Sequence, residues 1–199
     1  LEIMRRLLDG EKLTYQGTYY QTDRAKLYSP PVGRVPIWMA AGGPKSAGLA
    51  AELADGIITS VKVPADTIEK VITPARTAAA KAGRSDPRII ATRWSIHAQD
   101  RDEAWAALGA WRGLRAPGRL EAIDPQELRE RADQLPREEV LGRYAVVGGP
   151  DEMVATYLPL VTELGADVVT IQITSLQQEA TISVLGEAVL PRLRRAAAG

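Results

Sequence analysis

Short apolar segments alternate with helical segments along this chain, and this alternation constrains the fold more than any other feature. Strands are predicted at residues 35–41, 56–60, 88–97 and 167–174. Helices are predicted at residues 46–54, 64–82, 102–113, 151–164 and 179–197. Strands that alternate with helices predict βα units and a parallel sheet, and apolar β-branched strands suit a sheet that is covered on both faces.

Shorter elements precede and interrupt this alternation. Apolar residues at helical spacing predict a helix over residues 1–9, which Gly10 ends, and turn motifs in residues 11–34 indicate a small hairpin. Two short helices are predicted at residues 125–132 and 137–143. Because no internal repeat or linker interrupts the pattern, we expect a single domain over residues 1–199.

Four βα strands leave the type of sheet open. A flavodoxin-like or Rossmann sheet is compatible with them, although Gly42-Gly43-Pro44 does not match the dinucleotide-binding spacing G-x-G-x-x-G. A (β/α)8 barrel needs eight strands and roughly 250 residues, so this chain would hold about half of one. The chain begins at Leu1 inside a predicted helix and without Met, so we expect it to be cut from something longer.

Balanced charge and the lack of cysteine narrow the classes of function. Lys plus Arg and Asp plus Glu both number 25, which argues against binding to nucleic acid or a membrane surface through overall charge. Without cysteine there is no disulfide or thiolate metal site, and a cytoplasmic location is compatible with that. No apolar run reaches the length of a membrane span.

The Gly42-Gly43-Pro44 turn is the first candidate site. It follows a predicted strand and opens a helix, where bare backbone and free N–H groups would suit a phosphate. A tight βα turn that needs positive φ explains the same residues, and the stretch alone favours this structural explanation.

Thr59, Ser60 and Lys62 end the second predicted strand. The carboxyl ends of parallel strands bind ligands in barrels and open sheets, and a hydroxyl beside an ammonium suits a phosphate ester. A helix cap with a solvated lysine is an equally good explanation.

Two arginines occupy less informative positions. Arg119 belongs to a Gly/Pro-rich loop with several arginines, which is either an anion clamp or, more simply, a solvated surface. Arg143 lies between a predicted helix and residues 144–150, and Gly148-Gly149-Pro150-Asp151 predicts a structural turn with Asp151 as helix N-cap. His97 is the only histidine and is more simply a hydrogen-bonded structural residue than a base.

Four stretches resemble the luciferase-like family of TIM-barrel flavin and deazaflavin oxidoreductases: YQGTYYQTDRAKLYSPP, VPIWMAAGGPKSAGLAAELADGIITS, ADQLPREEVLGRYAVVGGPDE and VLPRLRR. The second is the most specific, because P-I-x-x-A-A-x-G-P followed by A-D-G recurs in the family. The likeness runs through nearly all 199 residues and is strongest to the F420-dependent glucose-6-phosphate dehydrogenases.

The resemblance implies an α/β fold of the (β/α)8 TIM-barrel type, with only about strands 5–8 present. It implies an oxidoreductase that moves a hydride from a sugar 6-phosphate to coenzyme F420. The alternatives are an F420- or FMN-dependent enzyme with another substrate, and a non-catalytic half-barrel that only assembles. We therefore expect a small-molecule partner and no nucleic acid or membrane.

The resemblance also assigns the cofactor site and the catalytic half. Ala41, Gly42 and Gly43 would lie against the cofactor. The catalytic groups of the family lie in the first four strands, so we expect no catalytic residue and no metal ligand here. A half-barrel exposes sheet edges, so we expect a homodimer or pairing with an N-terminal half-barrel.

The resemblance assigns the phosphate site to four residues. Thr59, Lys62 and Arg143 match the sugar-phosphate pocket of the family, and Arg119 stands where the family has a lysine. An arginine keeps the charge but changes reach and geometry, which leaves the identity of the sugar phosphate open.

Overall fold

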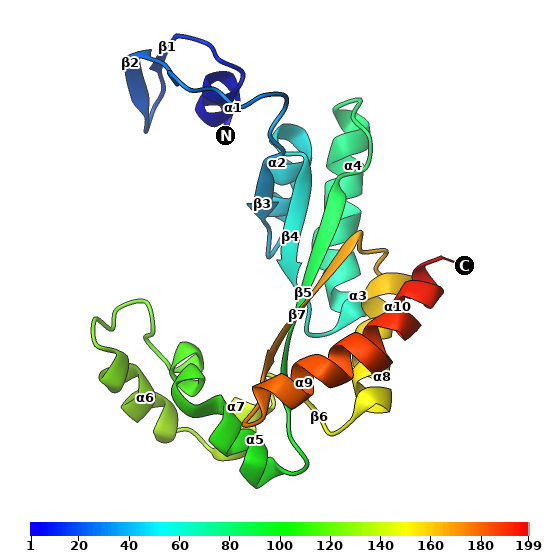
Figure 1. Cartoon of the computed structure of the whole chain (residues 1–199). Coiled ribbons are helices and arrows are strands. Elements are labelled where there is room, and N and C mark those ends of the chain that lie inside the picture. Colours follow the sequence, from blue (N-terminus) through cyan, green and yellow to red (C-terminus); the bar gives the residue numbers. More distant parts are fainter. Residues whose placement is uncertain (199) are drawn as a thin grey trace. The chain divides into compact units, whose positions relative to one another are not determined.

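The computed structural model (Figure 1) describes the backbone of residues 1–198 and all their side chains except those of residues 110 and 115. The chain forms two compact units. Unit 1 comprises Leu1–Thr59 and Ile68–Ile90, and unit 2 comprises Ser60–Thr67 and the chain from Ala91 onward. Strand β5 (Arg88–His97) runs through the boundary, so its first three residues belong to unit 1.

Unit 1 opens with a helix and a hairpin, as the sequence predicts. Helix α1 (Glu2–Leu8) is followed by Gly10, whose φ of +85° reverses the chain. Strands β1 (Leu13–Gln16) and β2 (Gln21–Ala25) then pair antiparallel.

The rest of unit 1 is a parallel strand pair and the helices that accompany it. Strand β3 (Trp38–Ala40) pairs in parallel with β4 (Gly56–Ser60). Helix α2 (Pro44–Leu53) lies beside helix α4 (Thr73–Lys81), and Figure 1 shows their close approach. Alanines make this approach possible, since five of them are buried on the two helices: Ala47, Ala50, Ala51, Ala75 and Ala79.

Strand β3 is shorter than the predicted strand at residues 35–41. Pro36 has no N–H to donate to a neighbouring strand. The N–H of Ile37 donates instead to the Asp55 carboxylate at 2.7 Å. The regular strand therefore starts only at Trp38.

Asp55 ties several segments of unit 1 together. Its carboxylate accepts the Ile37 N–H and forms ion pairs with Arg5 and Arg34. Arg5 also donates to the Val35 carbonyl at 2.7 Å. Burial raises the pKa of Asp55, but the Ile37 hydrogen bond and the two arginines lower it more, so the pKa lies below its usual value.

Two long helical runs contain wide π turns where the sequence predicts continuous helices. The first run begins with α3 (Pro64–Thr67) of unit 2 and continues through a π segment (Ile68–Ile72) into α4, both of unit 1. In unit 2, α9 (Gln178–Val184) leads through a π segment (Leu185–Val189) into α10 (Leu190–Ala197). Each π segment ends two residues before a proline, whose ring and missing N–H prevent a regular α turn at that point.

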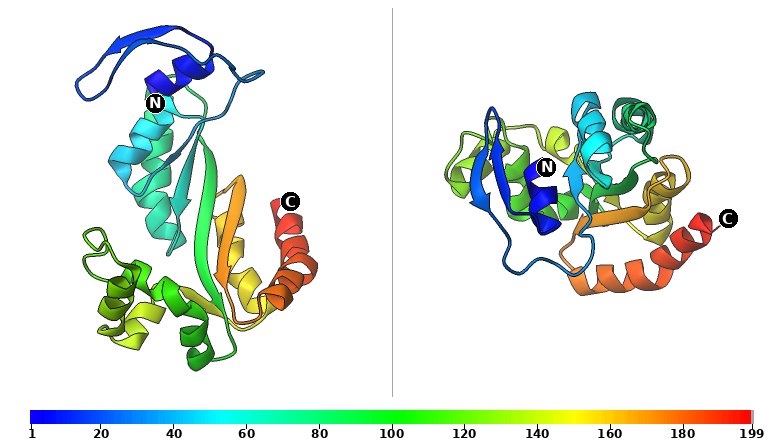
Figure 2. Two further views of the ribbon diagram at one scale, coloured as in Figure 1. Left: turned by 60° about the vertical axis from the view of Figure 1, so that its left-hand side comes forward. Right: turned by 90° about the horizontal axis from the view of Figure 1, so that it is seen from above.

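Unit 2 is built around β5, which pairs in parallel with β6 and also pairs with β7. Its other elements are α5 (Arg101–Leu108), a 3-10 segment (Gly109–Arg115), α6 (Pro125–Asp133), α7 (Arg137–Leu141), β6 (Ala145–Val147), α8 (Pro150–Thr162) and β7 (Val168–Thr174). Helices α8 and α10 lie side by side next to β7 (Figure 2).

Strand β6 is absent from the four predicted strands. A strand of three residues is too short for a periodic pattern to reveal it. The predicted cap is also wrong, because helix α8 starts at Pro150 with Gly149 as its N-cap, so that Asp151 lies inside the first turn. None of the helices in the described part of the chain is long and apolar enough to span a membrane.

The core of unit 2 positions the segment that follows α7. Fully buried side chains from β5, α5 and α7 pack together: Ile96, Leu108, Val140 and Leu141. Tyr144 joins this cluster, and Trp94 packs against it. Arg143 therefore lies between Leu141 and Tyr144, two residues that anchor the chain in the core.

Candidate functional site

The Gly42-Gly43 turn leaves open space beside its backbone. Neither glycine has positive φ, and Gly43, the N-cap of α2, is fully extended at −168°, so the explanation by a tight turn with positive φ is wrong. A Cβ atom added to either glycine would meet nothing within 4 Å. Ala41 is buried and donates its N–H to the Ile58 carbonyl at 2.9 Å, which fixes the turn at the end of the strand.

A second Gly-Gly-Pro turn, at residues 148–150, differs because acidic side chains occupy the start of the helix that follows it. Gly149 starts α8 with almost the same φ, −169°. There, however, the Glu152 carboxylate accepts the N–H of Gly148 at 2.6 Å, and Asp151 adds a second negative charge to the first turn. Helix α2 has no acidic residue in its first turn and no side-chain cap. Its N-terminus therefore favours an anionic group.

A small cavity in unit 2 brings together cations from three separate segments. Its volume is about 220 Å³, and its lining residues are Ser60, Val61, Lys62, Arg93, Trp94 and Arg143. Lys62 follows β4 and Arg143 follows α7, yet both residues line the same cavity. Two of the cations that the sequence predicts for a phosphate site thus meet at one cavity.

Thr59 and Ser60 point in opposite directions, as neighbours on a strand must. Thr59 is buried, with 2% of its surface exposed, whereas Ser60 is exposed. Of these two residues, Ser60 lines the cavity of Lys62.

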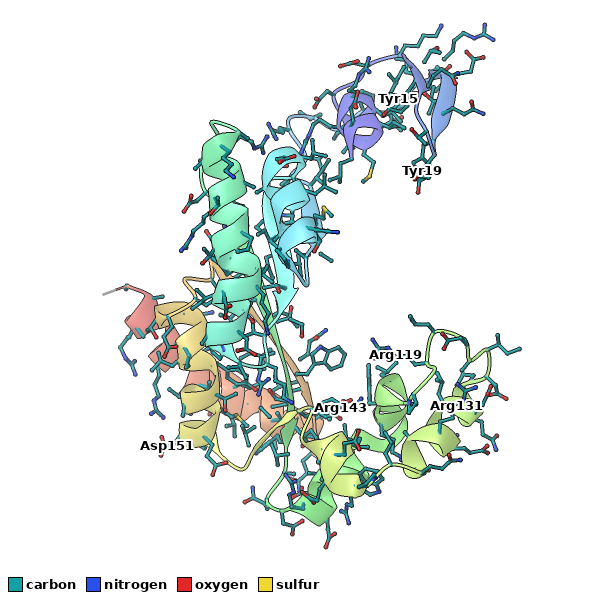
Figure 3. All side chains as sticks on the ribbon, turned by 180° about the vertical axis from the view of Figure 1, so that it is seen from behind. Tyr15, Tyr19, Arg119, Arg131, Arg143 and Asp151 are labelled. Carbon is teal, nitrogen blue, oxygen red and sulfur yellow. The ribbon has the colours of Figure 1, made fainter. Side chains whose placement is uncertain are left out.

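Arg119 lies in the loop before α6 and lines a second, more open cavity of about 450 Å³. Arg143 lines this cavity too, so it is common to both (Figure 3 labels both arginines). Arg119 is exposed and shares the cavity with Glu121, while Arg143 forms an ion pair with Glu139 at 2.8 Å. Glu121 and Glu139 would therefore compete with an anionic ligand for Arg119 and Arg143 in this cavity.

Arg93 is a cation that the sequence analysis did not select. Its side chain is half-buried on β5 and donates from Nη1 to the Val61 carbonyl at 3.0 Å. Burial lowers its pKa, because removal from water disfavours the charged form. One feature of the sequence could have indicated Arg93: it is a charged residue in the middle of the otherwise apolar predicted strand RIIATRWSIH. Charged residues are rarely buried without a partner, so a charge at such a position can indicate a binding site.

An aromatic cavity of about 200 Å³ shares Trp94 with the cationic one. Trp94 contacts the rings of Trp111 and Tyr144, with centroids 6.1 and 6.5 Å away, and all three line the space. Polar groups are present as well, since Ser95 and Gln172 also line it. The organic part of an anionic ligand would find both apolar and polar surface here.

His97 has a structural hydrogen bond. Its Nδ1 lies 2.7 Å from the Thr181 hydroxyl, which itself donates to the Gln177 carbonyl at 2.9 Å. The hydroxyl must therefore accept from His97, which assigns the ring proton to Nδ1. This contact ties β5 to α9 and agrees with the structural interpretation of His97.

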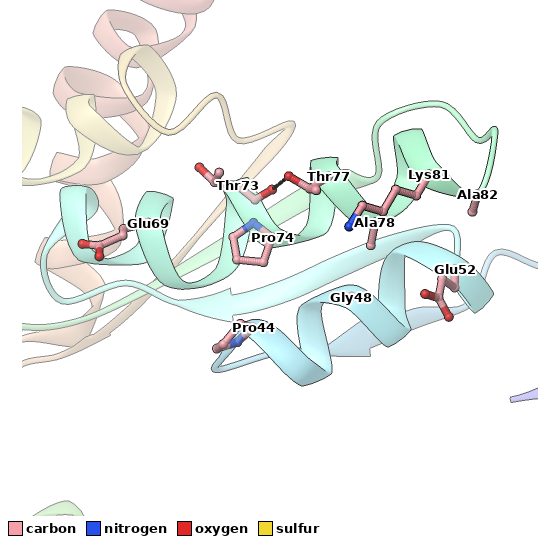
Figure 4. Close-up of a pocket in the computed structure, with 10 residues that line it drawn as sticks. All are labelled: Pro44, Gly48, Glu52, Glu69, Thr73, Pro74, Thr77, Ala78, Lys81 and Ala82. Atoms are coloured by element: carbon pink, nitrogen blue, oxygen red, sulfur yellow. Dashed lines mark hydrogen bonds between the residues drawn. The ribbon is translucent and has the colours of Figure 1, made fainter.

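The groove between α2 and α4 is larger, at about 570 Å³, and lies on the helical side of unit 1 (Figure 4). Small residues such as Gly48 and Ala78 form its floor, and Thr77 donates to the Thr73 carbonyl at 2.9 Å. None of the predicted site residues lines it. Within the described residues, no group of three or more His, Asp or Glu side chains could hold a metal ion.

Comparison with known proteins gives a consistent set of similarities. The model of the family described as luciferase-like monooxygenase matches residues 1–167. F420-dependent glucose-6-phosphate dehydrogenases from Nakamurella multipartita and Microbacterium testaceum are each 33% identical over 98% of this chain. The chain spans only 58% and 59% of the length of these two relatives.

Solved structures point the same way. An F420-dependent secondary alcohol dehydrogenase in complex with an F420–acetone adduct has a TM-score of 0.79 and 25% identity to this chain. The superposition covers 98% of this chain and 59% of the dehydrogenase. The F420-dependent tetrahydromethanopterin reductase from Methanopyrus kandleri has a TM-score of 0.71 at 23% identity, covering 96% and 61%. The α/β fold with parallel strand pairs thus matches somewhat more than half of these chains.

Proposed function

This chain belongs to the luciferase-like monooxygenase family, and on that premise we propose that it is part of an F420-dependent dehydrogenase that oxidises a sugar 6-phosphate such as glucose 6-phosphate. The premise alone would allow other substrates. The observation that carries the proposal is the cavity that Lys62 and Arg143 line together with Ser60.

The phosphate group would be bound by charge. Lys62 and Arg143 line the cavity, and we propose that Arg119 reaches the phosphate from the adjoining cavity that Arg143 also lines. We assign Thr59 to the same site as a residue that supports the end of β4. Each hydrogen bond between a cation and a phosphate oxygen contributes roughly 1.5–3 kcal/mol, so two or three of them would dominate the affinity for the substrate.

The turn at Ala41, Gly42 and Gly43 is the proposed contact with F420. The residues fit such a group, because open space adjoins both glycines and the N-terminus of α2 has no side-chain cap. When bound, F420 supplies a deazaflavin ring that accepts a hydride. The protein's part at this turn is to present bare backbone and N–H donors and thereby to hold the cofactor in one orientation.

This chain contributes binding rather than proton transfer to the proposed reaction. Phosphate binding far from the reacting carbon supplies energy that fixes the position of the sugar. We assign no acid or base to the described residues. We further propose that residues 1–199 form one domain that pairs with a second copy or with an N-terminal half-barrel.

Substituting Lys62 by alanine tests the phosphate site. The melting temperature of the purified chain should rise when glucose 6-phosphate is added, because a ligand that binds only the folded form stabilises it. This rise should vanish in Lys62→Ala. Lys12→Ala, which removes an exposed lysine of unit 1, should keep the full rise.

Glucose and inorganic phosphate serve as comparison ligands in the same measurement. Stabilisation by glucose 6-phosphate and phosphate but not by glucose would support the proposal. If glucose 6-phosphate leaves the melting temperature of the folded chain unchanged, the sugar-phosphate assignment is wrong and an uncharged substrate or a purely assembling role becomes the better explanation.

Substituting Gly42 by alanine tests the cofactor contact. The added Cβ meets nothing within 4 Å, so the free energy of unfolding should change by less than about 0.5 kcal/mol. Affinity for F420, measured by fluorescence titration, should fall at least tenfold, because the methyl group would occupy the space proposed for the cofactor. Equal F420 affinity in both proteins would rule out this contact.

A further inference from the structure

Arg93 occupies a position that is costly for a charge. It interrupts an apolar strand whose residues Ile89, Ala91 and Ile96 are buried, and its own side chain is half-buried. A cation removed from water normally needs an anionic partner. Within the described residues, Arg93 donates to one backbone carbonyl and has no carboxylate within ion-pair distance.

Among the described residues, no acidic side chain lines the cavity of Arg93. Its cavity is lined by one hydroxyl residue and three cations, with no acidic side chain. The other cavities that contain cations differ in this respect. Glu121 lines the cavity of Arg119, and Glu52 and Glu69 line the groove that contains Lys81. Arg143 is already paired with Glu139, whereas no carboxylate among the described residues pairs with Arg93, so an anion in this cavity of about 220 Å³ would give Arg93 an opposite charge.

We propose that Arg93 is a phosphate-binding residue that completes the anion site formed by Lys62 and Arg143. The inference rests on the proposed function, because it adds a third cation to the same site. The ligand class is a phosphate monoester. Arginine suits this role, since its planar guanidinium carries five N–H donors and can bind two phosphate oxygens at once, whereas Lys62 offers a point charge.

The hydrogen bond to Val61 gives Arg93 a second effect on the site. Val61 separates Ser60 from Lys62, and its carbonyl accepts from Nη1 of Arg93 at 3.0 Å. The N–H of Val61 donates to the Thr92 carbonyl at 2.8 Å. These two contacts hold the Lys62 segment against β5.

Two substitutions separate charge from structure. Arg93→Gln keeps an N–H donor for the Val61 carbonyl but removes the charge, and Arg93→Lys keeps the charge. Arg88→Gln is the matched control, because Arg88 lies on the same strand, is exposed and belongs to unit 1. The measurements are the melting temperature without ligand and the dissociation constants of glucose 6-phosphate and inorganic phosphate by calorimetry.

We expect Arg93→Gln to weaken both ligands at least tenfold while the melting temperature of the ligand-free chain stays within about 3 °C. Arg93→Lys should weaken them less than Arg93→Gln does, and Arg88→Gln should leave both dissociation constants unchanged. Arg93→Gln with unaltered phosphate affinity would overturn the inference, and would leave the proposed function standing if Lys62→Ala abolishes binding. A folded chain that binds neither ligand would overturn both.

Discussion

Replacing Asp55 by alanine is expected to lower the free energy of unfolding by about 2–3 kcal/mol. The carboxylate accepts the Ile37 N–H and pairs with Arg5 and Arg34, and only 21% of the side chain is exposed. Its removal leaves the N–H group and the largely buried Arg5 guanidinium without their partner. Urea denaturation at pH 7 measures the loss.

The pH dependence of stability provides a second measure of the same interaction. Because the pKa of Asp55 is lower in the folded chain than in the unfolded one, its contribution is complete above the unfolded pKa of about 4. It is lost as the pH falls through the lower, folded pKa. Stability of Asp55→Ala should therefore decline less than that of the unchanged chain as the pH falls below about 4.

Asp23→Ala is the control for the Asp55 substitution. Asp23 also pairs with an arginine, Arg24, but both side chains are more than 70% exposed. Its loss should change stability by less than about 0.5 kcal/mol, as is usual for exposed pairs. Similar effects of the two substitutions would contradict the role that we assign to Asp55.

Replacing Leu141 by alanine should lower the free energy of unfolding by about 3 kcal/mol. Leu141 is fully buried with Ile96, Leu108 and Val140, so the smaller side chain leaves a cavity. Leu120→Ala is the matched control, because Leu120 is 87% exposed. Equal melting temperatures for the two variants would show that this cluster does not hold unit 2 together.

The Leu141 substitution also bears on the anion site. Arg143 follows Leu141 by two residues, and its place in the cavity depends on the packing of α7. We therefore expect Leu141→Ala to weaken glucose 6-phosphate binding as well as stability.

The motif that carries the family resemblance divides into a structural and a functional part. Asp55 and Gly56 of A-D-G are required by the structure. Asp55 binds Arg5, Arg34 and the Ile37 N–H, and a Cβ on Gly56 would lie 2.8 Å from the Arg88 carbonyl oxygen. The structure does not require glycine at positions 42 and 43, because neither residue has a positive φ and a Cβ atom would meet no neighbour at either position. The motif alone does not distinguish the residues that the fold requires from those that are free to contact a ligand.

Most helices and strands could be predicted from local pattern, and the exceptions have local causes. Strand β6 has only three residues, and the two π segments arise from prolines inside otherwise regular helical patterns. Strand β3 is short because Pro36 cannot donate and Ile37 bonds to Asp55. A periodic pattern over ten or more residues predicts an element reliably, whereas a single interaction can change the bounds of an element of three to five residues.

The sequence by itself determined the α/β class, the order of the βα units and the family, because each depends on residues that are neighbours along the chain. Only the tertiary structure decided which cations share a cavity. Lys62, Arg93 and Arg143 come from three distant segments, and the pairing of β5 and the packing of α7 bring them to one space. Arg93 was overlooked for the same reason. A charge in a strand becomes a candidate for ligand binding only when its neighbours across the fold are also positive and it has no carboxylate partner of its own.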